Sequence, residues 1–193
     1  MFRIGIKSEF AMKTLALIVA ILMFCVAGNA QNRMLGFGFG GGIAIPTDDA
    51  ADYSKIGFDG FVNGMLSFSS SFNAGVILGY ASFPSKMVDT LNLPNTVVRA
   101  FLLRGAYTFT SEQRIHPYIA AFGGLYHTKI NKCLTVTGNE VVSVNITDSS
   151  YGYGVEAGVR RGHLSVGVAY HVVGFDFKYV LVNVGYSLFF KIR

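Results

Sequence analysis

Charged residues are scarce in this sequence of 193 residues, where Asp, Glu, Lys and Arg together make up only 14%. A typical soluble domain has about 25%. Tryptophan is absent, and the two cysteines, Cys25 and Cys133, offer no metal-ligand spacing. The net charge of +5 is not concentrated in any basic run, which argues against nucleic acid as a partner.

The first thirty residues have the three parts of a secretory signal peptide. Basic residues precede the apolar run from Leu15 to Ala27, and small residues follow it. This run is too short for a transmembrane helix, which needs about 20 residues. We therefore predict a cleaved signal peptide over residues 1–30 and a mature domain over 31–193. The mature domain would carry a net charge of +3 and a single cysteine, which cannot form an internal disulfide.

After residue 30 the recurring pattern has a period of two residues, as in β-strands, and no helical period is visible. Eight segments place large apolar residues on one face and glycine, small or polar residues on the other. In the first, Leu35, Phe37 and Phe39 alternate with Gly36 and Gly38. The fifth segment is ambiguous because both of its faces are apolar or small, and its three aromatic residues are assigned to the large apolar face. The predicted large apolar faces are Phe58, Val62, Leu66 and Phe68 in segment two, Phe72, Ala74, Val76, Leu78 and Tyr80 in segment three, and Phe101, Leu103, Tyr107 and Phe109 in segment four. They are Tyr118, Phe122 and Tyr126 in segment five and Tyr151, Tyr153, Val155, Ala157 and Val159 in segment six. They are Leu164, Val166, Val168, Tyr170 and Val172 in segment seven, and Val180, Val182, Val184, Tyr186, Leu188 and Phe190 in segment eight.

The connections between these segments alternate in length. Brief turns follow segments two, four and six, at residues 69–71, 111–116 and 161–163. Longer polar loops follow segments one, three and five, at residues 47–56, 85–96 and 129–149, and the last connection, 174–177, is short. Short turns at one rim and long loops at the other are typical of an up-and-down barrel. The sequence therefore predicts an all-β fold, an eight-stranded antiparallel up-and-down β-barrel whose last strand pairs with its first.

The composition of the two faces predicts which side of the barrel meets lipid. A soluble barrel turns its large apolar residues inward, whereas a membrane barrel turns them outward and keeps small and polar residues in its lumen. Here the second face is rich in glycine, which suits the narrow lumen of an eight-stranded barrel better than a water-facing surface. We therefore predict a transmembrane barrel whose lumen is plugged by small and polar side chains. The predicted polar network consists of Asp59, Asn63, Arg104, Glu156, Arg160 and Asn183.

Aromatic residues gather at both ends of the apolar stripes, as they do at the two interfaces of a membrane. At the short-turn rim we expect Phe68, Phe72, Tyr107, Phe109, Tyr118, Tyr186 and Phe190. At the long-loop rim we expect Phe58, Tyr80, Tyr126, Tyr151 and Tyr170.

The longest loop, 129–149, contains two β-rich runs, 134–137 and 141–146, on either side of Gly138 and Asn139. A Gly-Asn pair suits a hairpin turn. These runs would extend the fifth and sixth strands beyond the membrane as a ribbon, and its exposed edge would offer a surface to another protein. The alternative is a variable surface loop with no dedicated ligand.

The C-terminal residues 183–190 resemble the terminal β-signal of bacterial outer-membrane barrels. That signal is a polar residue, then glycine two positions later, then hydrophobic residues at two alternate positions. The four places are held here by Asn183, Gly185, Leu188 and Phe190, although Lys191-Ile192-Arg193 follow. The run 117–124 is similar to a central strand of the small outer-membrane β-barrel family, which includes OmpA-type transmembrane domains and OmpX. The resemblance implies that the barrel-insertion machinery recognises the last strand.

One motif points to a different chemistry. Gly36, Gly38 and Gly41 match the spacing of a dinucleotide-binding turn, but the residues after them, which end in Pro46, do not begin a convincing helix. We predict no cofactor and no metal site. A lipid esterase would need a serine beside a histidine. No such motif is recognisable, and the histidines are expected at the rims: His116, His127, His163 and His171.

We predict an integral protein of the bacterial outer membrane, with both mature termini on the periplasmic side. Its expected role is structural or surface-interacting and not enzymatic. Its expected partners are outer-membrane lipid, the barrel-insertion machinery and, through residues 129–149, a surface protein. One alternative is a narrow outer-membrane channel. The other is a soluble periplasmic barrel that binds an apolar ligand, as lipocalins do, with its large apolar residues turned inward.

Overall fold

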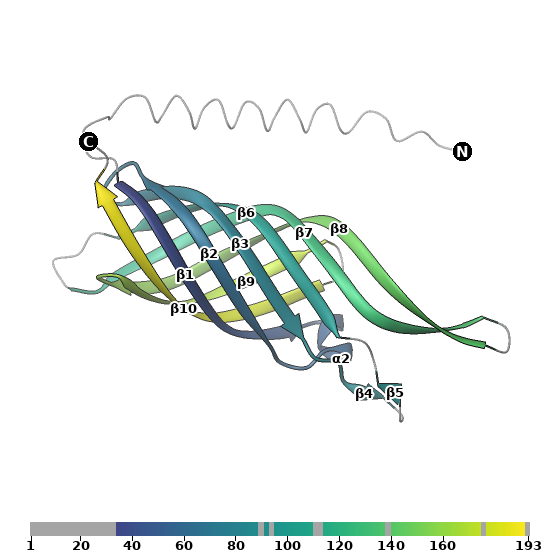
Figure 1. The fold of residues 1–193 in the computed structure, drawn as a ribbon. Coiled ribbons are helices and arrows are strands. Elements are labelled where there is room, and N and C mark those ends of the chain that lie inside the picture. Colours follow the sequence, from purple (N-terminus) through teal and green to yellow (C-terminus); the bar gives the residue numbers. More distant parts are fainter. Residues whose placement is uncertain are drawn as a thin grey trace.

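The computed structural model describes residues 34–88, 91–92, 95–109, 114–137, 140–174 and 177–191. The predicted signal peptide and the turn residues Gly138 and Asn139 lie outside these ranges. The described chain is almost entirely β-structure (Figure 1), which confirms the all-β prediction. No helix in this part of the chain is long and apolar enough to cross a membrane.

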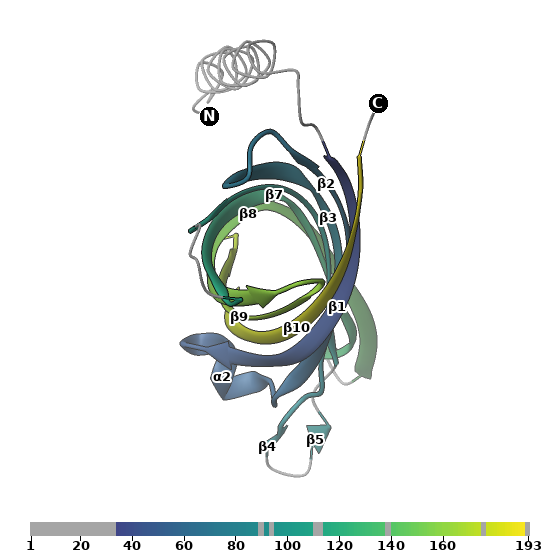
Figure 2. The same cartoon turned by 90° about the vertical axis from the view of Figure 1, so that its left-hand side faces the viewer.

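Eight of the described strands close into an antiparallel up-and-down barrel in the order β1-β10-β9-β8-β7-β6-β3-β2. Their bounds are β1 (Met34–Thr47), β2 (Gly57–Ser67), β3 (Phe72–Phe83), β6 (Thr96–Thr108), β7 (His116–Thr137), β8 (Glu140–Arg161), β9 (Leu164–Val173) and β10 (Phe177–Lys191). Figure 2 shows the ring nearly end-on, with β1 beside β10. The two strands pair from Met34–Lys191 to Thr47–Lys178, so the predicted closure of the last strand on the first is confirmed.

The two ends of the barrel differ, as the connection lengths predict. Short turns at one end join β2 to β3, β6 to β7 and β8 to β9. In the last of these, Gly162 has a φ of +60°, which a two-residue hairpin turn requires. The connections at the other end contain a short helix, α2 (Asp49–Tyr53), and a small hairpin of β4 (Met87–Val88) and β5 (Leu91–Asn92). The sequence pattern did not reveal α2, because five residues are too few to show a helical period.

The strands β7 and β8 are much longer than the others, at 22 residues each. β7 pairs with β6 only as far as Ile130, and β8 pairs with β9 only from Gly152 onward. Beyond these points the two strands pair only with each other, up to Thr137 and Glu140. They form a two-stranded ribbon that projects from the barrel (Figure 1), which confirms the predicted extension of the fifth and sixth strands.

The large apolar side chains of seven of the eight strands face outward, as predicted. The exposed fractions of Phe39 and Val184 are 60% and 55%. Their sequence neighbours Gly38 and Asn183 are buried in the lumen. This inside-out arrangement is that of a membrane barrel and the reverse of a soluble one.

The assignment of the fifth segment, which became β7, is wrong. Tyr118, Phe122 and Tyr126 point into the lumen and are at most 6% exposed. Ile119 and Leu125 take outward positions on this strand instead, with exposed fractions of 52% and 48%. Tyr118 and Tyr126 therefore do not belong to the aromatic rims.

The neighbouring strand β8 explains why these rings turn inward. Tyr118 pairs with Gly158, and Phe122 pairs with Gly154. A β-carbon on Gly154 would lie 2.3 Å from a ring carbon of Phe122, so the ring fills the space that the glycine leaves free. The lumen of this barrel has room for the rings because the lumen face of β8 has almost no side chains next to them.

Candidate functional site

Four side chains form the polar cluster in the lumen half nearer the short turns: Arg104 of β6, Tyr118 of β7, and Glu156 and Arg160 of β8. Arg104 donates to Glu156 Oε2 from Nε at 3.2 Å and from Nη2 at 3.0 Å. The Tyr118 hydroxyl donates to the other oxygen, Oε1, at 2.6 Å. The guanidinium of Arg160 lies 5.8 Å from the ring centroid of Tyr118 and 5.5 Å from that of Phe189.

Burial makes these contacts necessary. The side chains of Arg104 and Glu156 are only 8% and 11% exposed, and a charge buried without a partner costs several kcal/mol. Here both carboxylate oxygens of Glu156 accept hydrogen bonds, so the negative charge is compensated. Gly167 of β9 allows the arrangement, because a β-carbon there would lie 2.6 Å from the Tyr118 hydroxyl.

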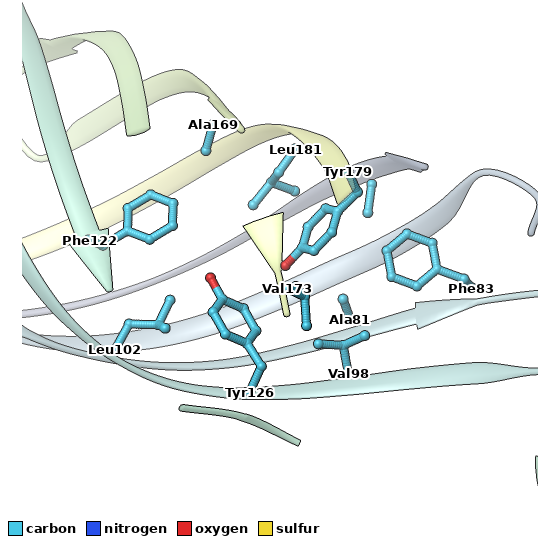
Figure 3. Packing of buried hydrophobic residues seen from close by; sticks show 11 residues of the cluster. Ala81, Phe83, Val98, Leu102, Phe122, Tyr126, Ala169, Val173, Tyr179 and Leu181 are labelled. Atoms are coloured by element: carbon cyan, nitrogen blue, oxygen red, sulfur yellow. The ribbon is translucent and has the colours of Figure 1, made fainter. Parts of the chain in front are cut away.

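Five buried rings form the aromatic cluster in the lumen half nearer the long loops: Phe83, Phe122, Tyr126, His171 and Tyr179. His171 stacks on Tyr179 with a centroid distance of 4.4 Å and an interplanar angle of 9°. Its Nδ1 lies 3.0 Å from the hydroxyl oxygen of Tyr126. Figure 3 shows Phe122, Tyr126 and Tyr179 converging in the lumen with the aliphatic side chains of this core. Tyr126 and Tyr179 are among the largest fully buried side chains of the described chain.

The expected rim position of His171 is therefore wrong. Strand alternation puts His171 on the same face as Ser165 and Ala169, and the structure buries it in the lumen at 7% exposure. Aromatic stacking and the hydrogen bond to Tyr126 give the imidazole ring a place inside the barrel.

A cavity of about 60 Å³ lies between the two clusters. It has room for a few water molecules. Asp59 and Asn183 are 8% and 4% exposed, and within the described chain Asn63 Oδ1 is buried without a hydrogen-bond partner. All six residues of the predicted polar network line this cavity: Asp59, Asn63, Arg104, Glu156, Arg160 and Asn183.

The glycine spacing that matches a dinucleotide-binding turn and the residues that resemble the β-signal lie in two neighbouring strands, β1 and β10. Gly36, Gly38 and Gly41 lie within β1 and not at a strand-to-helix turn, which a dinucleotide site would require. The residues that resemble the β-signal lie in β10, where Asn183 and Gly185 face the lumen and Leu188 and Phe190 face outward. No group of three or more potential metal-ligating His, Cys, Asp or Glu residues occurs in the described ranges.

One contact between a histidine and a serine was not predicted from the sequence. His127 Nδ1 lies 2.8 Å from Ser149 Oγ on the outer face of the barrel. The signal was available, because the two residues lie at equal distances from the hairpin turn predicted near Gly138. In a hydrolase a carboxylate would orient the imidazole, and none of the described side chains provides one at His127.

No protein-family model matches this sequence, and the search of curated proteins found no relative. Among solved structures, Neisserial surface protein A matches with a TM-score of 0.58 over 82% of this chain and 97% of that one, at 15% identity. The fold is that of the small bacterial outer-membrane β-barrels. Other small outer-membrane barrels align less closely. OprG from Pseudomonas aeruginosa aligns with a TM-score of 0.48 and 12% identity, over 84% of this chain and 98% of that one. Ail of Yersinia pestis aligns with a TM-score of 0.41 and 13% identity, over 81% of this chain and 98% of that one.

Proposed function

We propose that this chain is an integral outer-membrane β-barrel protein with a structural or surface-interaction role and a plugged lumen. The observation that carries the proposal is the outward-facing apolar belt on a closed sheet. Soluble proteins rarely expose apolar patches larger than a few hundred Å². Closure satisfies the backbone groups of the barrel strands without water, which the bilayer core requires.

The height of the belt fits a bilayer. On β7 the outward positions from Pro117 to Leu125 are apolar or glycine. Nine residues at about 3.3 Å each, tilted by about 40°, span about 23 Å along the barrel axis. The apolar band of outer-membrane barrels is about 25 Å high.

The plug is supported by the contents of the lumen. The aromatic cluster lies in the long-loop half, and the Arg104–Glu156 pair joins β6 to β8 inside the lumen. The competing proposal is a narrow channel, which the cavity of about 60 Å³ favours because Asp59, Asn63 and Asn183 are among its lining residues. Single-channel recording in a planar bilayer separates the two, because a plug gives no steady conductance and a channel does.

The ribbon of β7 and β8 carries the proposed surface interaction. Beyond Ile130, β7 has no pairing with β6, and before Gly152, β8 has no pairing with β9. Unpaired strand edges can accept the extended strand of another protein. Deleting residues 131–145 should abolish such binding and leave the barrel folded, because the paired residues among them, from Cys133–Val144 to Thr137–Glu140, pair only with each other.

The alternative of a soluble lipocalin-like barrel needs the large apolar faces turned inward, and on seven of the eight barrel strands they face outward. The further parts of the proposal are periplasmic termini, insertion guided by Asn183, Gly185, Leu188 and Phe190, and no enzymatic activity.

The deciding experiment is gel migration of the protein from isolated outer membranes, with and without boiling in detergent. A closed barrel should migrate fast when unboiled and slow down after boiling. Recovery in the soluble periplasm without such a shift would contradict the membrane location.

A further inference from the structure

Three basic residues gather on the outer wall of the barrel, at the long-loop end: Arg99 of β6, and His127 and Lys129 of β7. Arg99 pairs directly with His127 in the β6–β7 ladder. Lys129 is two residues further along β7, so strand alternation puts its side chain on the same face. All three residues are exposed. They form one continuous basic patch on two neighbouring strands.

The patch begins where the apolar belt ends. Phe101 and Leu125 are the last outward residues of the belt on β6 and β7, and they pair with each other. Arg99 and His127 are the next outward residues on the same strands. Since the belt has the height of a bilayer core, the patch lies at the level of the lipid headgroups.

Hydroxyl groups adjoin the basic side chains on the next strand. Ser149 of β8 pairs with His127, and Thr147 pairs with Lys129, so both face the same way. Asp148, between them, takes the opposite face by alternation. Among the described residues, an ion pair at this rim joins Lys178 to Asp48, at 2.8 Å, on the far side of the barrel. The wall of β6 to β8 therefore combines positive charge with hydrogen-bond donors and has no described carboxylate on its outer face.

We propose that Arg99, His127 and Lys129 bind the phosphate group of an anionic membrane lipid. The planar guanidinium of Arg99 matches a pair of phosphate oxygens, and the Lys129 ammonium adds a second charge. The site runs directly into the lipid-facing belt, so the acyl chains of the bound lipid would lie against Phe101 and Leu125. This geometry selects a lipid over free phosphate. The inference rests on the proposed membrane location.

The test compares lipid selectivity in vesicles of two compositions, phosphatidylcholine alone and phosphatidylcholine with phosphatidylglycerol. Native mass spectrometry of the extracted protein gives the ratio of the two lipids retained. We expect phosphatidylglycerol to be enriched, and the double variant Arg99→Gln/Lys129→Gln to lose about five-fold in affinity for each charge removed. The matched control is Arg161→Gln, which removes an exposed arginine at the short-turn end of β8 and should leave the enrichment unchanged.

Three other results of this experiment would each contradict a different part of the proposal. Equal enrichment in the double variant and the wild type would overturn the assignment of the patch. Loss of the lipid when inorganic phosphate is added would show that free phosphate is the ligand. A chain that gives no heat-shifted band in either vesicle would overturn the membrane barrel itself, and the lipid site with it.

Discussion

The contact between Gly167 and Tyr118 gives a quantitative test of how the lumen is packed. A β-carbon at Gly167 would lie 2.6 Å from the Tyr118 hydroxyl oxygen and 3.1 Å from Glu156 Oε1. The Gly167→Ala variant must therefore displace the phenol, whose hydroxyl donates to Glu156 at 2.6 Å. The added methyl group therefore disturbs the polar cluster and not only the strand that carries it.

The expected magnitudes follow from this shared contact. Overpacking a filled interior costs about 1–3 kcal/mol, and losing a hydrogen bond to a charged group costs about 1.5–3 kcal/mol. We expect Gly167→Ala and Tyr118→Phe each to lower the free energy of unfolding by about 2 kcal/mol. The double variant should be about as stable as Tyr118→Phe alone, because the hydroxyl that the methyl group meets is gone. The coupling energy is then about 2 kcal/mol.

The assay is urea unfolding of the protein refolded into lipid vesicles, for the wild type and the three variants. Gly105→Ala is the matched control, because a β-carbon at Gly105 meets nothing within 4 Å. Its stability should stay the same or rise by about 0.5 kcal/mol, as for other glycines replaced in strands. Strictly additive losses in the double variant would refute the reasoning, since they would mean that Tyr118 does not lie over Gly167.

Three further predictions concern the outer face, the polar cluster and the aromatic cluster. Val184→Arg puts a charge on the lipid-facing side and should lower the free energy of unfolding by about 2–4 kcal/mol. Asn183→Ser in the lumen should lower it clearly less. Equal losses of stability in urea unfolding would contradict the inside-out arrangement. Glu156→Gln leaves the buried Arg104 without its carboxylate and should lower stability by about 3–5 kcal/mol in the same titration, and a loss below 1 kcal/mol would mean that the pair is solvated. Phe122→Ala should cost about 3–5 kcal/mol by opening a void among the lumen rings, and a neutral result would show that this ring is not packed.

The strands and most of their faces were predictable because the side-chain period of a strand is two. In β1, large residues such as Phe37 and Phe39 alternate with glycine, so local sequence separates the two faces. In β10 the alternation of Val182 and Val184 with Asn183 does the same. The charged residues of the lumen could be found for the same reason, since Arg104 and Glu156 interrupt otherwise apolar or glycine-rich strands.

The aromatic cluster was not predictable in this way. On β7 both faces carry apolar or small residues, so alternation alone does not say whether Phe122 or Ile119 faces outward. His171 was expected at a rim, because its sequence neighbours gave no sign of the Tyr126 and Tyr179 rings that surround it. Contacts of this kind join strands that are distant in sequence.

The sequence alone determined the number of barrel strands, the closure of the barrel and the apolar exterior of seven of its strands, because each follows from a two-residue alternation and from connection lengths. Only the tertiary structure decided which side chains fill the lumen. The pairing of β7 with β8 places Phe122 beside Gly154 and Tyr118 beside Gly158. The space that admits an aromatic ring is the volume missing on a neighbouring strand, and that volume exists only once the register between the two strands is set.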